Sequence, residues 1–172
     1  MEEHEKKPEE KALERRLAGN LPTLDIAGDI FLIDLEKKCL CPKNPLAPGD
    51  ISFARLQGYF SWTEDKYIFT YNSTQHGPQD IDFSDLYHIP ESIHLVEFPS
   101  MERLDPVGYA REHGYDIRSF VEKVGIQSHF KANTIPVRES LSRLLAEKRE
   151  CPKEQRQNQT RRQKVKRRGR GR

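Results

Sequence analysis

The sequence predicts an α+β domain in which an antiparallel β-meander is followed by C-terminal helices, with disordered segments at both ends. Apolar residues make up 35% of the chain and charged residues 33%. Most aromatic and aliphatic residues gather between residues 21 and 130. There the apolar pattern first alternates and later recurs every three to four residues, as in strands and then helices. The two ends are too polar to build a core.

The composition therefore divides the chain into four parts. We expect a polar N-terminal segment with a short helix, an α+β domain, a C-terminal helix and a disordered basic tail, over residues 1–19, 20–130, 131–150 and 151–172. One folded domain flanked by polar segments fits this pattern better than a single core of 172 residues.

The first predicted elements are a helix and a hairpin. Residues 8–18 begin with a proline, carry glutamates in the first turn and arginines near the end, and stop before Gly19, which suits a left-handed cap. Strands over 24–27 and 30–35 are expected to pair around a turn at Gly28-Asp29. The second strand begins with a continuous apolar run, which predicts that both of its faces are covered.

The remaining strands lie between residues 51 and 98. Residues 42–50 hold three prolines and predict a loop, and 51–56 suit a short strand or a turn of helix. The aromatic-rich runs 59–62 and 67–71 predict an antiparallel pair, followed by a turn over 72–79. An exposed strand over 80–83 and a last strand over 93–98 complete the meander.

Helices follow these strands. Asp105-Pro106 predicts a helix start, and His113-Gly114 its end. Asp116 is expected to cap a second helix that ends at Gly125. A third helix is expected over 136–149.

Cysteine content and hydropathy indicate in which cellular compartment the protein is expected. There are three cysteines, Cys39, Cys41 and Cys151, which imply no disulfide framework and favour a reducing, cytoplasmic location. The sequence has no apolar run long enough for a signal peptide or a membrane span, so we expect no membrane partner.

Motifs for catalysis are lacking, which leaves enzymatic activity open but disfavoured. We find no phosphate loop, nucleophile elbow or HExxH sequence, and we predict no cofactor and no catalytic residue. Asp80, Asp82 and Asp85 could bind Mg²⁺, but alternation places the first two on the solvent face of a strand, and Asp85 is expected to cap a turn.

A metal site at Cys39-x-Cys41 is also disfavoured. Structural zinc needs four ligands, usually from two Cys or His pairs, and no second pair exists in this sequence. Strand alternation would instead send both thiols to one face of a strand, with Leu40 on the other. We therefore predict no metal.

Two surfaces remain as alternatives for binding. The helix–Gly–helix segment over 105–124 could read DNA, but Glu122 has the wrong charge for a groove, which favours a hairpin that covers the core. The aromatic residues of the meander could form a protein-binding surface, although a place in the core is favoured. These residues are Tyr59, Phe60, Trp62, Tyr67, Phe69 and Tyr71.

The basic tail is the strongest indication of a partner. Residues 148–172 hold 12 Lys and Arg against two Glu, a net charge of +10 that leaves −8 for the rest of the chain. Arginine binds phosphate bidentately, so the tail predicts nonspecific contact with DNA or RNA. An acidic protein, the chain's own acidic body or a purely solubilising role are the alternatives. The candidate nucleic-acid-binding residues are Arg161, Arg162, Lys164, Lys166, Arg167, Arg168, Arg170 and Arg172.

Two short motifs carry a resemblance to a known family. The stretches 21–28 (LPTLDIAG) and 104–108 (LDPVG), with residues 109–114 after the latter, resemble an uncharacterised Bacteroidetes protein family often found beside mobile-element genes. The resemblance covers about residues 20–125. It implies no activity, cofactor or site residue, and favours a DNA-related role by association only.

Overall fold

The first of two sheets joins the N-terminal strands to one strand from the far end of the fold. The computed structural model describes residues 6–47, 49–82, 84 and 88–142. Across this sheet the order is β4 (Ile51–Ser52), β3 (Cys39–Pro42), β2 (Asp29–Asp34), β1 (Thr23–Ile26) and β9 (His129–Lys131). β9 runs parallel to β1, whereas the other neighbours are antiparallel.

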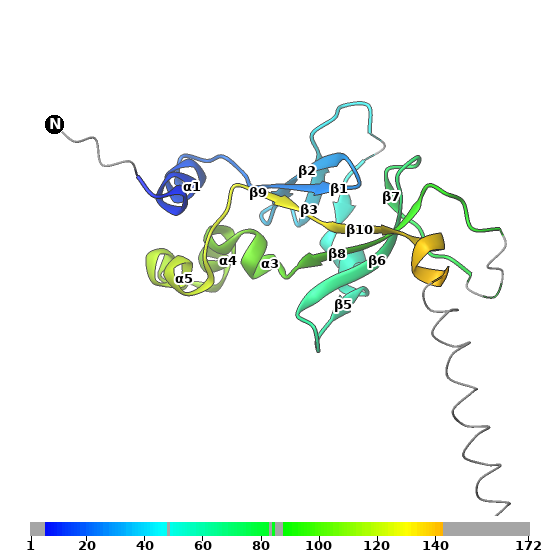
Figure 1. Ribbon diagram of the computed structural model, residues 1–172. Coiled ribbons are helices and arrows are strands. Elements are labelled where there is room, and N and C mark those ends of the chain that lie inside the picture. The colour runs from blue at the N-terminus through cyan, green and yellow to red at the C-terminus, as the bar shows by residue number, and fades with distance from the viewer. Residues whose placement is uncertain (1–5, 48, 83, 85–87, 143–172) are drawn as a thin grey trace, which may run out of the picture.

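The second sheet is antiparallel throughout. Its order is β10 (Asn133–Pro136), β8 (Ile93–Pro99), β6 (Lys66–Asn72) and β5 (Phe60–Ser61), and the short β7 (Gly77–Pro78) pairs with β6. The segment that forms β9 in the first sheet continues directly into β10 in the second. Residues 129–136 therefore link the two sheets (Figure 1).

Most of the helices gather at one end of the sheets. The described helices are α1 (Pro8–Leu17), α2 (Phe53–Gln57), α3 (Met101–Leu104), α4 (Pro106–His113) and α5 (Ile117–Val124), and residues 137–142 are also helical. α1, α4 and α5 lie together beyond the ends of the strands (Figure 1), where Ala12, Val107 and Val121 form a small apolar cluster.

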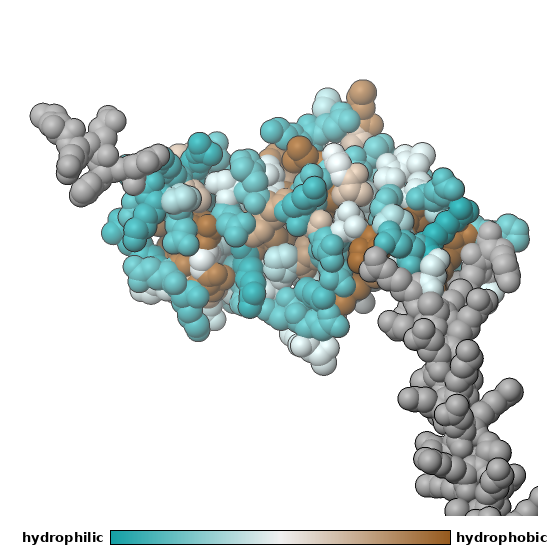
Figure 2. Space-filling model, in the orientation of Figure 1, coloured by the Kyte–Doolittle hydropathy of each residue, from teal (hydrophilic) through white to brown (hydrophobic). Residues whose placement is uncertain are grey.

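The main core lies between the sheets. Leu24 and Ile33 of the first sheet and Val96 of the second are fully buried. Phe31 meets Tyr71 edge-on across the core, with ring centroids 6.5 Å apart. Figure 2 shows a largely hydrophilic outer face with apolar residues in small separate areas. Within the described residues, no helix is long and apolar enough to cross a membrane.

The α+β class is confirmed, as are several element boundaries. α1, the β5–β6 pair and the capped helices α4 and α5 lie where the sequence predicts them, and the predicted hairpin of β1 and β2 is present. Residues 51–57 combine both predicted alternatives, a two-residue strand followed by a helical turn. The C-terminal helix begins at residue 137, and its predicted part beyond residue 142 lies outside the described residues.

Other expectations are wrong. The hairpin turn is Ala27-Gly28, both with positive φ, one residue earlier than predicted. The face of β2 opposite the core is not covered throughout, because Ile30 is 44% exposed. Residues 80–82 form no strand. The strands β9 and β10 were not predicted.

Candidate functional site

The structure does not describe the predicted nucleic-acid-binding residues. All eight candidate residues of the tail, and Cys151, lie beyond residue 142. Asp85 of the acidic set also lies outside the described residues. These assignments therefore stay predictions from sequence.

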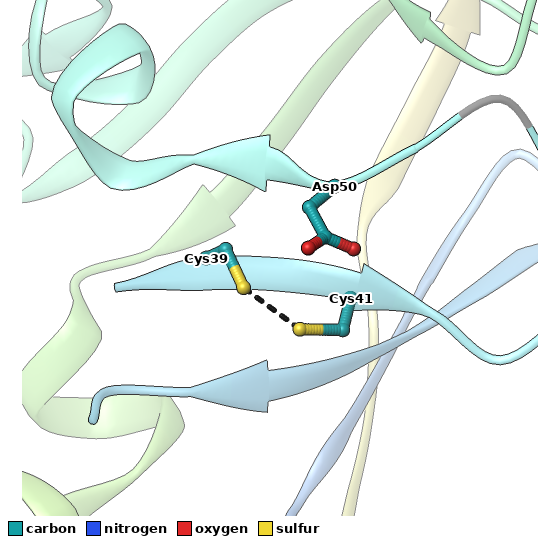
Figure 3. Close-up of side chains that lie close together, drawn as sticks. All are labelled: Cys39, Cys41 and Asp50. Carbon is teal, nitrogen blue, oxygen red and sulfur yellow. Dashed lines mark hydrogen bonds between the residues drawn. The ribbon is translucent and has the colours of Figure 1, made fainter. Parts of the chain in front are cut away.

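A cluster of two thiols and a carboxylate lies on the face of the first sheet that points away from the core. Cys39 and Cys41 of β3 share this face because side chains alternate along a strand, and Leu40 between them is fully buried in the core. Their sulfur atoms are 2.7 Å apart (Figure 3). The predicted common face of the two thiols is thus confirmed.

The neighbouring strand brings Asp50 to the same place. β3 and β4 pair with Cys39 opposite Ser52 and Leu40 opposite Ile51. Continuing this register by one residue places Asp50 opposite Cys41, on the same face. The two sulfurs and a carboxylate oxygen of Asp50 lie within 4.8 Å of one another (Figure 3). A search for Cys and His pairs in the sequence misses this set, because one of its three groups is a carboxylate that directly precedes the next strand.

Burial and negative charge keep the Cys39 thiol protonated. Its side chain is buried, and burial together with the contact to Cys41 and the carboxylates of Asp50 and Asp34 raises its pKa to about 12. Asp34 is the residue opposite Cys39 on β2. The two thiols therefore lie between two acidic side chains contributed by neighbouring strands.

The meander aromatics mostly belong to the core. Phe69 and Tyr71 are buried, and Tyr67 packs against Phe98 with ring centroids 5.2 Å apart. Trp62 is the exception, with 84% of its surface exposed. The proposed aromatic surface is therefore reduced to Trp62 and the half-buried Phe60 beside it.

A Tyr–Asp–His group connects the two sheets. The Tyr71 hydroxyl donates to Asp29 Oδ2 at 2.7 Å, and Nδ1 of His76 lies 2.9 Å from both Asp29 oxygens. Burial and this hydrogen bond raise the pKa of Tyr71 well above its ordinary value. Because Asp29 begins β2 and Tyr71 lies in β6, we interpret the group as a polar link between the sheets.

A hollow of about 560 Å³ lies between α1, β1 and the segment before β9. Its wall includes the buried Arg16–Asp105 ion pair, in which two guanidinium nitrogens each donate to a carboxylate oxygen at 2.9 Å. Arg15, Lys43 and His129 also line it, and all three are exposed. The Thr23 hydroxyl lies 2.6 Å from Nδ1 of His129.

The other sequence candidates have structural roles. Asp80 accepts a hydrogen bond from the Tyr59 hydroxyl, and Asp82 accepts one from the backbone N–H of Ser84. The hydroxyl and the N–H of Ser84 together lower the pKa of Asp82. In the α4–α5 hairpin, Val121 packs into the small cluster under α1, as expected for a hairpin that covers the core.

Comparison of the chain with protein-family models, curated proteins and solved structures found no match. The LDPVG motif nevertheless has a physical explanation in this structure. Leu104 and Val107 are fully buried, Asp105 caps α4 and pairs with Arg16, and Pro106 occupies the first helical position. The motif therefore forms the joint between α1 and the end of the second sheet.

Proposed function

We propose that this protein is a cytoplasmic, non-enzymatic accessory protein whose basic tail, residues 151–172, contacts nucleic acid electrostatically. The observation that carries the proposal is the charge of the last 25 residues, which is +10. Eight of the last twelve residues are Lys or Arg, and none is aromatic. Phosphate contact without base stacking predicts binding that is insensitive to sequence and sensitive to salt.

Acidic residues of the folded body can compete with nucleic acid for the basic tail. Residues 49–97 carry eight acidic side chains and two basic ones. The last described residues, 137–142, lie beside this acidic part, because Val137 packs with Ile89 and Ile93, and Arg138 binds Glu91 at 3.0 Å. A tethered partner has a high effective concentration. We therefore expect the acidic body to weaken nucleic-acid binding at low salt without abolishing it.

Salt-dependent binding tests the tail. We expect the full chain to bind duplex DNA and single-stranded RNA, with a log–log salt slope of about −5 on the duplex if six phosphates are engaged. A full-length variant with all eight candidate Lys and Arg changed to Gln should lose this binding at physiological salt. A chain ending at Glu150 should lose it as well, since it retains every described residue. Fluorescence anisotropy of labelled oligonucleotides measures both.

The matched control changes the same Arg residues to Lys, which keeps the charge and removes the bidentate fork. We expect this variant to keep the salt slope with somewhat weaker binding. Equal binding by the full chain and the Gln variant would contradict the proposal, and so would the absence of binding by the full chain at physiological salt.

A protein-interaction module is the second candidate function, and Trp62 is the observation that favours it. The indole packs edge-on against Phe60, with centroids 4.9 Å apart, and is otherwise exposed. Glu64 and Asp65 follow it in the same exposed turn. Both carboxylates already form ion pairs within the chain, Glu64 with Lys66 at 2.7 Å and Asp65 with Arg103 at 3.6 Å. The exposed indole ring is therefore the group that suits an Arg- or Lys-containing segment of a partner protein.

Tryptophan fluorescence tests whether the Trp62 ring is exposed to solvent in solution. It is the only tryptophan, so the emission of the full chain reports this one site. We expect red-shifted emission and quenching by acrylamide nearly as efficient as for free tryptophan, because the ring is solvent-exposed. Phe60→Leu should leave both readings almost unchanged. Blue-shifted, protected emission in the full chain would show that Trp62 is covered in solution.

A further inference from the structure

The cluster on β3 and β4 combines ligand types that suit one class of metal ion. Thiolate sulfur selects soft or borderline cations such as Zn²⁺, whereas Mg²⁺ and Ca²⁺ require oxygen ligands. Three potential ligand atoms, from Cys39, Cys41 and Asp50, lie within 4.8 Å of one another. Zinc sites with three protein ligands leave the fourth tetrahedral position for water or another small ligand.

We propose that Cys39, Cys41 and Asp50 bind a zinc-class d10 cation, with the fourth coordination position open to solvent. This inference is independent of the proposed nucleic-acid contact, because it concerns the folded body and not the tail. It also departs from the expectation of no metal, which rested on the lack of a second Cys or His pair.

The backbone holds the three ligands in place, so little rearrangement is needed. Two sulfurs bound to one tetrahedral zinc at about 2.3 Å lie about 3.8 Å apart. The sulfur atoms are 2.7 Å apart in this structure, so they must separate by about 1 Å. Cys41 is half-buried and Asp50 is exposed. Side-chain rotation of these two residues provides this movement without disturbing the buried Leu40 between the thiols.

The electrostatic surroundings favour a cation. Asp34 lies opposite Cys39 on β2, and its carboxylate lies 3.7 Å from the exposed Lys37 ammonium and also interacts with the Arg16 guanidinium, which is itself paired with Asp105. The ammonium of Lys38, next to Cys39 in the chain, lies 3.8 Å from Glu112. Binding of a divalent cation displaces the two thiol protons to solvent and leaves a site of net charge −1. The affinity should therefore fall in acid.

Cobalt and zinc titrations of the full, reduced chain test the site. We expect one Co²⁺ per chain with sulfur-to-cobalt charge-transfer absorbance, displaced by one Zn²⁺. Zinc at a hundredfold excess over its Kd should raise the Tm by roughly 5–10 °C. Cys39→Ser, Cys41→Ser and Asp50→Asn should each weaken zinc binding at least about tenfold, the lower bound for loss of an outer-shell partner.

Two matched controls separate this site from the rest of the chain. Cys151→Ser removes the third thiol, and Asp65→Asn removes an exposed carboxylate from a distant turn. Both should bind zinc as the unchanged chain does. Asp50→Asn keeps the buried residues intact, so it remains informative even if a cysteine variant fails to fold by circular dichroism.

Four results would overturn the proposal. One is the lack of charge-transfer absorbance in the reduced, folded chain. Another is full-strength zinc binding by a folded Cys39→Ser or Cys41→Ser variant. The third is a loss of binding in Cys151→Ser as large as that in the cluster variants. A chain that forms a Cys39–Cys41 disulfide, and takes up no metal after reduction, would likewise exclude a metal site.

Discussion

Asp105→Asn is expected to lower the free energy of unfolding by about 3–5 kcal/mol, the cost of removing one partner from a buried ion pair. Asp105 is fully buried and Arg16 nearly so. The carboxylate accepts two hydrogen bonds from Arg16 and one from the backbone N–H of Gly108. The substitution leaves a buried guanidinium without its counter-ion. Urea unfolding followed by circular dichroism measures the change.

Asp116→Asn is the matched control, because Asp116 caps α5 as Asp105 caps α4. Asparagine caps helices about as well as aspartate, and Asp116 is exposed, so this change should be nearly neutral. Changing Arg16 to Met together with Asp105→Asn should recover part of the loss, since no buried charge then remains. Equal, small effects of the two Asn substitutions would show that the ion pair contributes little.

Gly108→Ala is expected to destabilise the fold by about 1–3 kcal/mol through overpacking. A methyl group on Gly108 would overlap the Asp105 carboxylate and lie 2.9 Å from Leu35 Cδ1. Both neighbouring side chains are buried, and Asp105 is also held by its hydrogen bonds to Arg16, which limits how far they can shift. The change should also disturb the hydrogen bond from the Gly108 N–H to Asp105. Thermal and urea unfolding of the full chain measure the loss.

Gly58→Ala is the control for this prediction. A methyl group there would meet only the Arg55 carbonyl oxygen at 3.7 Å, an ordinary contact, and Gly58 has a φ of −65°. The same chemical change should therefore be neutral or slightly stabilising, as it reduces the freedom of the unfolded chain. If Gly108→Ala also leaves the stability unchanged, the joint at LDPVG is less tightly packed than the structure indicates.

Local signals in the sequence were sufficient for most helices and hairpins. Each helix signal lies within a few residues of the helix end that it marks. These signals are the proline and glutamates of α1, the Asp105 and Asp116 caps, and Gly114 at the end of α4. The aromatic runs that pair as β5 and β6 also lie close together in sequence. The common face of Cys39 and Cys41 follows from strand alternation alone.

Features that depend on distant partners could not be predicted. β9 and β10 are three and four residues long and gain their strand structure from β1 and β8. The Asp105 partner, Arg16, is 89 residues away in the chain. Asp50 joins the two thiols only because β4 pairs with β3 in one register. Pairing of this kind depends on tertiary packing and leaves no local signal.

Because residues 129–136 supply a strand to each sheet, both sheets stay incomplete during synthesis until this segment has been made. Thr23 of β1 pairs with His129 of its parallel neighbour β9, so β1 is synthesised long before β9. Until β9 and β10 emerge, one edge of β1 and one edge of β8 have no strand beside them. Open strand edges in incomplete chains favour association with other chains. A chain interrupted before Pro136 should therefore be prone to aggregation even though most of its core residues are present.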